Sequence, residues 1–168
     1  TMKNKDYWNL RAKKNKQTIK STTNFNLIKE FEISILKYLF EKYLKKKSLK
    51  ILELGCGNGV NLKSLKNIFP KFEFYGIDYS KEMVKHAKKN NNNINFIEAD
   101  ITKTNIYNEL PKFDVIFTNR CLINLKSKNK INLAISKSEY LLKKGGYFIF
   151  LENYIIVCFH FLLNALCS

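Results

Sequence analysis

Residues 51–60, ILELGCGNGV, constrain the fold of this chain more than any other segment. The short apolar run at its start is typical of a strand covered on both faces. Three glycines follow in alternation, Gly55, Gly57 and Gly59, and glycines at this spacing let a backbone turn tightly and approach a ligand closely. Residues 61–69 carry apolar side chains at helical spacing, so the turn opens a helix. Strand, glycine turn and helix N-terminus together predict a nucleotide-type binding site in an α/β fold.

The residues around the glycines narrow the class of ligand. Val60 stands where the third glycine of a GxGxxG dinucleotide fingerprint would fall, and no GxxxxGK[ST] phosphate loop is present. Glu53 places a carboxylate two residues before Gly55. An anion at that point would repel a pyrophosphate and attract a cation. A ligand with an ammonium, a sulfonium and a ribose therefore fits better than NAD.

Three further strand-like runs end in polar side chains, at Asp78, Asp100 and Asn119. Parallel strands present their C-terminal ends at one edge of an open sheet, which is where ligands bind. Asp78 can accept both hydroxyls of a ribose, and Asp100 can accept from an exocyclic amine such as that of adenine. A fifth strand-like run covers residues 146–151.

Five segments in order resemble the successive motifs of class I S-adenosylmethionine-dependent methyltransferases: ILELGCGNG, YGIDYSKEMVKHA, FIEADIT, FDVIFTNRCLINL and LLKKGGYFIF. The resemblance covers residues 27–153. It implies an α/β fold, a Rossmann-like three-layer sandwich around a mostly parallel sheet. Five strands are clear in this sequence, and the last two strands of the family are missing from it.

The resemblance also implies which residues hold S-adenosyl-L-methionine. The glycine turn would hold the methionine part, Asp78 the ribose, and residues after the second and third strands the adenine. Asn119 would line the floor of the site below the methyl group. The N-terminal DYWNLRAKK is similar to an arm that folds over the cofactor, in which Arg11 could pair with the methionine carboxylate. The full expected set is Glu53, Gly55, Cys56, Gly57, Gly59, Asp78, Tyr79, Met83, Asp100, Ile101, Asn119, Trp8 and Arg11.

The chain divides into a basic N-terminal arm (1–24), a cofactor-binding Rossmann-like domain (25–151) and an atypical apolar tail (152–168). Residues 25–44 predict an amphipathic helix, and residues 129–142 predict the last helix of the core. The apolar face expected of the first helix consists of Phe25, Ile28, Phe31, Ile35, Leu39 and Tyr43.

The tail, ENYIIVCFHFLLNALCS, has three competing explanations. A truncated or frame-shifted chain is favoured, because an unclosed apolar sheet edge is rare. Alternatively, the tail forms a final strand or helix that packs on the sheet. A membrane segment over residues 146–167 is the third and is disfavoured, because polar residues interrupt it.

Composition adds limits on partners and compartment. The net charge of +16 comes almost entirely from lysine, which indicates a lysine-rich surface rather than a selected nucleic-acid site. The four cysteines show no CxxC spacing, so no metal site is expected, and reduced thiols indicate a cytoplasmic protein.

The predicted function is methyl transfer from S-adenosyl-L-methionine to a small molecule by in-line displacement. The segment after the fourth strand lacks the (N/D)PPY pattern of nucleic-acid and protein amino-methylating relatives, which favours a small acceptor. No catalytic base stands out. A cofactor-binding remnant without activity and an RNA methyltransferase remain alternatives, whereas Glu53 and the missing third glycine argue against an NAD-dependent oxidoreductase.

Overall fold

The computed structural model describes residues 4–15, 26–44, 47–103, 108–152 and 155–160. The strands are β1 (Lys50–Leu54), β2 (Glu73–Asp78), β3 (Asn95–Glu98), β4 (Phe113–Asn119), β5 (Leu142–Glu152) and β6 (Ile155–His160). The helices are α1 (Asn4–Asn15), α2 (Asn26–Tyr43), α3 (Val60–Ile68), α4 (Lys81–Asn90) and α5 (Lys128–Tyr140), with a short 3-10 helix η3 (Leu122–Asn124).

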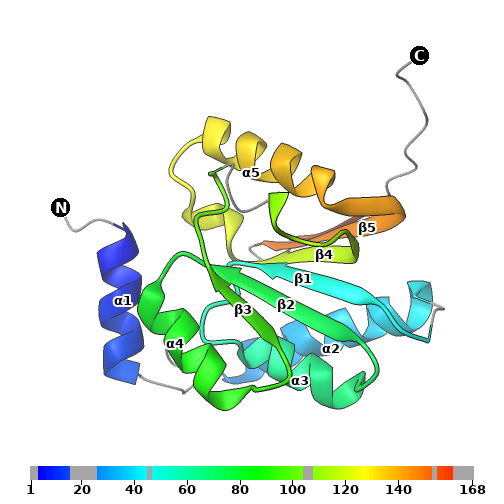
Figure 1. Cartoon of the computed structure of the whole chain (residues 1–168), viewed down its shortest axis with the longest axis horizontal. Helices are drawn as coiled ribbons and strands as arrows, with labels where there is room; N and C mark the ends of the chain where they lie inside the picture. Colours follow the sequence, from blue (N-terminus) through cyan, green and yellow to red (C-terminus); the bar gives the residue numbers. More distant parts are fainter. Residues whose placement is uncertain (1–3, 16–25, 45–46, 104–107, 153–154, 161–168) are drawn as a thin grey trace.

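The strands form one sheet in the order β3-β2-β1-β4-β5-β6 (Figure 1). The first five are parallel, and β6 pairs antiparallel with β5. The chain runs outward from β1 to β3 and then returns to the other side of β1 to form β4. This reversal places a topological switch point between β1 and β4, where α/β sheets bind ligands.

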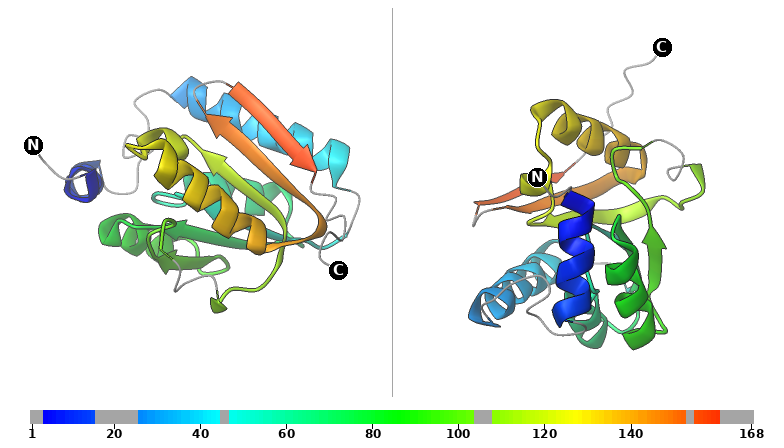
Figure 2. Two further views of the ribbon diagram at one scale, coloured as in Figure 1. Left: turned by 90° about the horizontal axis from the view of Figure 1, so that it is seen from above. Right: turned by 90° about the vertical axis from the view of Figure 1, so that its left-hand side faces the viewer.

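Helices cover both faces of the sheet, giving the predicted three layers (Figures 1 and 2). Ile51 belongs to the core on the face covered by α2, α3 and α4, whereas Leu52 belongs to the core on the face of α5. Consecutive strand residues point to opposite faces, so a continuously apolar strand serves both cores. The Rossmann-like three-layer fold predicted from the motifs is confirmed.

The five predicted strands are confirmed, and the tail adds a sixth. Its residues 155–160 form β6, which matches the explanation that the tail packs on the sheet as a strand; residues 161–168 lie outside the described part. Strand β5 begins at Leu142, earlier than expected, because α5 ends at Tyr140. Within the described ranges, no helix is long and apolar enough to cross a membrane.

Helix α2 buries a face that only partly overlaps the one predicted. Its buried residues are Lys29, Glu32, Leu36 and Phe40, and Ile35 and Leu39 of the expected face are partly buried and pack against the core. Phe31 of the expected face is 56% exposed, so the prediction was wrong there. Hydrophobic spacing takes no notice of charged side chains that find buried partners, and it therefore missed Lys29 and Glu32. Phe25 lies outside the described residues.

The predicted N-terminal arm contains helix α1, which packs against α4 (Figure 2). Ser80 Oγ, at the N-cap of α4, donates a hydrogen bond to Asn9 Oδ1 at 2.6 Å. Lys5 forms an ion pair with Glu98 at 3.4 Å. These contacts hold α1 beside the C-terminal edge of the sheet.

Candidate functional site

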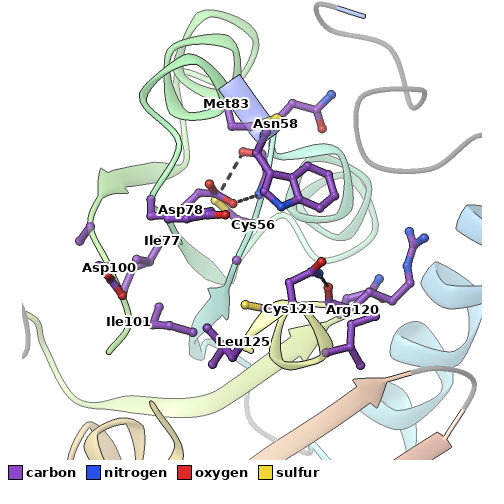
Figure 3. Close-up of a pocket in the computed structure, with 18 of the residues that line it drawn as sticks. Cys56, Asn58, Ile77, Asp78, Met83, Asp100, Ile101, Arg120, Cys121 and Leu125 are labelled. Carbon is purple, nitrogen blue, oxygen red and sulfur yellow. Dashed lines mark hydrogen bonds between the residues drawn. The ribbon is translucent and has the colours of Figure 1, made fainter. Parts of the chain in front are cut away.

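A cavity of about 480 Å³ lies at the C-terminal edge of the sheet, at the switch point (Figure 3). Its walls come from the β1–α3 turn, the ends of β2 and β4, the segment after β3, and the β4–α5 connection. Helices also contribute lining residues, among them Trp8 of α1, Lys29 of α2, Asn61 of α3 and Met83 of α4. Ten of the predicted site residues line it: Trp8, Gly55, Cys56, Gly57, Asp78, Tyr79, Met83, Asp100, Ile101 and Asn119.

The glycine turn has a backbone shape that side chains would disrupt. Gly55 has φ +73°, and a Cβ there would lie 2.3 Å from Cys121 Sγ. Gly59 has φ +78°, and a Cβ there would lie 2.7 Å from the ring of Phe96. The turn is anchored to β2, since the N–H of Gly55 donates to Ile77 O at 2.7 Å. Gly59 therefore shapes the turn at the start of α3, although it does not line the cavity.

Asp78 is held in place by the glycine turn that faces it. Its Oδ2 accepts from the N–H of Gly57 at 2.9 Å, and its Oδ1 accepts from the N–H of Ser80 at 2.8 Å. Burial raises the pKa of Asp78 to about 6, while the two N–H bonds oppose that shift. Each carboxylate oxygen retains a free lone pair. Asp78 can therefore accept two hydroxyl donors from a ligand.

Beyond Asp78 the cavity has an apolar wall suited to a planar base. Met83 and Ile101 are buried, and burial raises the pKa of Tyr79, which keeps its phenol neutral. Asp100 also lines the cavity, and its Oδ1 accepts from both the N–H and the hydroxyl of Thr102. Asp100 thus shapes the turn after β3 while leaving its other oxygen for a ligand.

Glu53 lies beneath the cavity wall, with only 1% of its surface exposed. Asn61 stands between it and the cavity: Asn61 Nδ2 donates to Glu53 Oε1 at 2.6 Å. Burial raises the pKa of Glu53 to about 8, so the group is mostly protonated at neutral pH. Asn61 lines the cavity at this point and Glu53 does not. A direct contact between Glu53 and a cationic ligand therefore stays a prediction.

Helix α2 contributes a buried ionic network that the sequence analysis missed. Lys29 Nζ lies 2.8 Å from Glu32 Oε2 and donates to Asn61 Oδ1 at 3.0 Å. Glu32 Oε1 lies 2.7 Å from Arg120 Nε, and Asn119 Nδ2 donates to Glu32 Oε2 at 2.9 Å. Burial lowers the pKa of Lys29, and Glu32 opposes this shift. The i, i+3 spacing of Lys29 and Glu32 was the available signal, but their partners lie far away in sequence.

The two expected arm residues differ in position. Trp8 lines the cavity, as expected for an arm residue that closes a site. Arg11 does not line it; its Nη1 donates to Tyr7 Oη at 3.0 Å, and its Cζ lies 5.9 Å from the Trp8 ring centre. Pairing of Arg11 with a carboxylate of the ligand stays a prediction.

The β4–α5 connection forms a far wall that the sequence analysis did not assign. Its lining residues are Cys121, Ile123, Asn124, Leu125 and Lys126, and Lys130 of α5 extends this wall. Glu152 supports this wall, since Oε1 accepts from the N–H groups of Cys121 and Leu122 at 3.1 Å. Burial raises the pKa of the Cys56 and Cys121 thiols well above the usual value, so neither is a ready nucleophile. No cluster of three metal-binding side chains occurs in the described ranges.

Comparison with known proteins identifies the family. Residues 45–157, more than half of the chain, match the family described as "Methyltransferase domain". The chain belongs to this methyltransferase domain family. The match begins just before β1 and ends within β6, so it includes the whole switch-point region of the fold.

Curated proteins similar to this methyltransferase domain are longer than the chain. A malonyl-[acyl-carrier protein] O-methyltransferase of Bacillus anthracis is 35% identical over 96 residues, which cover 56% of this chain and 35% of that protein. A carboxy-S-adenosyl-L-methionine synthase of Campylobacter concisus is 33% identical over 113 residues, covering 65% of this chain and 46% of that protein. The chain thus matches between a third and a half of the length of these relatives.

Solved structures support the fold of the methyltransferase domain. N-methyltransferase NodS from Bradyrhizobium japonicum, solved with S-adenosyl-L-homocysteine, superposes with a TM-score of 0.68 at 18% identity, covering 88% of this chain and 72% of NodS. Protein PH0226 from Pyrococcus horikoshii superposes with a TM-score of 0.62 at 27% identity, covering 76% of this chain and 55% of its own.

Proposed function

We propose that this chain is an S-adenosyl-L-methionine-dependent methyltransferase that acts on a small molecule. The observation that carries the proposal is the hydrogen bond between Asp78 and the glycine turn in the wall of the cavity. Gly57 holds the carboxylate at 2.9 Å and leaves it open to ligand hydroxyls. Asp78 is also next to an apolar wall, so one cavity offers a ribose acceptor and a place for a base.

The residues of the cavity fit an adenosyl cofactor. The glycine turn lines the cavity and packs so closely on Cys121 that a Cβ at Gly55 would lie 2.3 Å from Cys121 Sγ, so its backbone faces the ligand without a side chain at this point. The Oδ1 of Asn119 is buried and has no hydrogen-bond partner among the described residues, so it is available to a donor on the ligand. The similarity to a carboxy-S-adenosyl-L-methionine synthase and to NodS, solved with S-adenosyl-L-homocysteine, supports the same ligand class.

When bound, this cofactor supplies a methyl group on a sulfonium, which is already a good leaving group. The work of the protein is then to position the acceptor, and positioning can lower a barrier by about 7–11 kcal/mol. The far wall offers amide and cationic side chains, Asn124, Lys126 and Lys130, and no carboxylate or histidine among its described residues. We therefore assign this wall a role in holding the acceptor.

The proteins similar to this chain indicate a broad class of methyl acceptor. Similar proteins include an O-methyltransferase of malonyl-[acyl-carrier protein] and a phosphoethanolamine N-methyltransferase of Zea mays. The names of these two relatives indicate different acceptors, and the methylated atom is oxygen in one and nitrogen in the other. A small molecule or a small group on a carrier is the shared chemistry that supports our proposal for this chain.

Calorimetric binding to the full 168-residue chain tests the proposal. We expect S-adenosyl-L-homocysteine to bind and NAD not to bind. Asp78→Asn should weaken binding at least tenfold, because a charged hydrogen-bond acceptor contributes about 1.5–3 kcal/mol. Asp114→Asn is the matched control: Asp114 is also buried, but it lies at the start of β4, at the opposite edge of the sheet.

A folded wild-type chain that binds neither S-adenosyl-L-methionine nor its demethylated product would overturn the proposal. Binding without turnover across a panel of small acceptors would instead support the alternative of a cofactor-binding remnant.

A further inference from the structure

Glu32 is a buried carboxylate that organises the floor of the cavity without lining it. It is 6% exposed, and each of its oxygens has a cationic partner. Oε1 lies 2.7 Å from Arg120 Nε, and Oε2 lies 2.8 Å from Lys29 Nζ. Oε2 also accepts from Asn119 Nδ2 at 2.9 Å. Desolvating a carboxylate is costly, so an anion in this place needs all of these partners.

The bond to Asn119 fixes which way its amide faces. A carboxylate accepts hydrogen bonds and cannot donate them, so the NH₂ group of Asn119 must be turned toward Glu32. The carbonyl oxygen Oδ1 is then turned the other way. Oδ1 is buried and has no hydrogen-bond partner among the described residues, and Asn119 lines the cavity. The floor therefore presents a hydrogen-bond acceptor that lacks a donor.

The position of Asn119 along the sheet indicates which part of the ligand meets this acceptor. In the order β3-β2-β1-β4, Asp100 follows β3, Asp78 ends β2, and Asn119 ends β4. A ligand with its ribose at Asp78 and its base toward Asp100 extends in the other direction past β1. Thr118 is in register with Leu54, so Asn119 stands beside the first glycine of the turn. The end of such a ligand opposite its base would reach Asn119.

We propose that Glu32 is a positioning residue that orients Asn119 so that its Oδ1 accepts a hydrogen bond from the ammonium group of S-adenosyl-L-methionine. This proposal rests on the proposed function. Glu32 also neutralises Arg120, which lines the cavity beside Asn119, and so reduces repulsion of an incoming ammonium. Glu53 does not serve this purpose directly, because Asn61 separates it from the cavity.

Two ligands separate this role from a merely structural one. S-adenosyl-L-homocysteine carries the ammonium group, whereas 5′-methylthioadenosine has the same adenosyl part without the amino-acid end. Calorimetry on the full chain and on its variants would give both affinities. A hydrogen bond to the ammonium affects only the first ligand, whereas general damage to the cavity weakens both.

Two variants test the proposal in different ways. Asn119→Leu removes the acceptor at nearly constant size. Glu32→Asp keeps the negative charge in the network but shortens the side chain by one methylene, which withdraws the carboxylate from Asn119 as well as from Lys29 and Arg120. Each variant should bind S-adenosyl-L-homocysteine with an affinity lower by about tenfold or more. The affinity for 5′-methylthioadenosine should change less than twofold. Glu41→Asp is the matched control, because Glu41 is an exposed carboxylate on the same helix, and it should leave both affinities unchanged.

Equal losses for the two ligands, or unchanged binding of S-adenosyl-L-homocysteine in Asn119→Leu, would overturn the positioning role. Asn119→Leu changes no charge and tests the contact that the proposal requires. Unchanged binding in this variant therefore overturns the proposal even where Glu32→Asp unfolds in circular dichroism. Failure of the folded wild-type chain to bind either ligand would overturn the proposed function instead, so the two failures are distinct.

Discussion

Glu53 is the residue whose role depends most on its surroundings. In the sequence it is an anion beside a glycine turn, and electrostatics alone predicts that it attracts a cation. In the structure it is almost fully buried and accepts a single hydrogen bond on Oε1, while Oε2 has no partner among the described residues. Burial outweighs the opposing effects of Asn61 and Lys29 and raises its pKa to about 8. The protein therefore contains, behind the cavity wall, a carboxyl group that is mostly neutral at pH 7.

This raised pKa makes stability depend on pH. A carboxyl that binds its proton more tightly when folded stabilises the fold below its usual pKa of 4.5, and this contribution is lost as pH rises toward 8. The free energy of unfolding should fall between pH 5 and pH 8, by at most about 1.4 kcal/mol per pH unit for one group. Asp78, with a pKa of about 6, acts in the same direction over the lower part of this range.

Urea unfolding of Glu53→Gln checks this prediction. The variant should show a flatter dependence on pH above pH 6 and should be more stable than the wild type at pH 8. Glu73→Gln, which alters an exposed carboxyl at the start of β2, should follow the wild type. A Glu53→Gln profile that parallels the wild type would show that the group is ionised throughout.

At the scale of elements, α2 shows that residues of other elements can determine which face of a helix is buried. The apolar spacing of its sequence predicts one buried face. In the structure Ile35 and Leu39 of that face are only partly buried, and the fully buried residues include Lys29 and Glu32. These two charges are buried because Asn61, Asn119 and Arg120 surround them, and those partners belong to α3 and the end of β4. The sequence identifies the helix and its approximate length, but the buried face depends on residues far away in the chain.

Substitutions on the two faces of α2 should lower the free energy of unfolding by different amounts. Leu36→Ala should cost about 2–5 kcal/mol of unfolding free energy, because Leu36 is completely buried in the core. Phe31→Ala should cost less than about 0.5 kcal/mol, because its side chain is largely exposed. Denaturant unfolding of both variants at one pH measures the difference. Similar losses would support the face predicted from the apolar spacing.

For the whole molecule, the net charge of +16 is the dominant long-range feature. Self-repulsion destabilises a compact state of high net charge. Salt screens it, since the Debye length falls from about 30 Å at 0.01 M to about 8 Å at 0.15 M. The chain should therefore unfold at a higher temperature in 0.15 M than in 0.01 M sodium chloride.

Calorimetric melting at the two salt concentrations tests this, with sucrose of matched osmolality as an uncharged control. A lower midpoint in 0.15 M salt would mean that attractive ion pairs dominate the electrostatics of the fold. RNA affinity measured over the same range of salt concentration tests the alternative of an RNA methyltransferase. A steep dependence of this affinity on salt would favour an RNA acceptor.

The sequence by itself determined the α/β fold, its parallel strands, the glycine turn and the part of the cavity lining that follows the strand ends, because these follow from local patterns. Strand β1 is apolar on both faces, and Gly55 and Gly59 occupy backbone conformations that favour glycine. Only the tertiary structure decided that Glu53 lies behind Asn61, that α2 buries Lys29 and Glu32, and that part of the tail pairs with β5. Each of these outcomes depends on contacts between residues distant in sequence, where desolvation and the available partners decide which groups are buried.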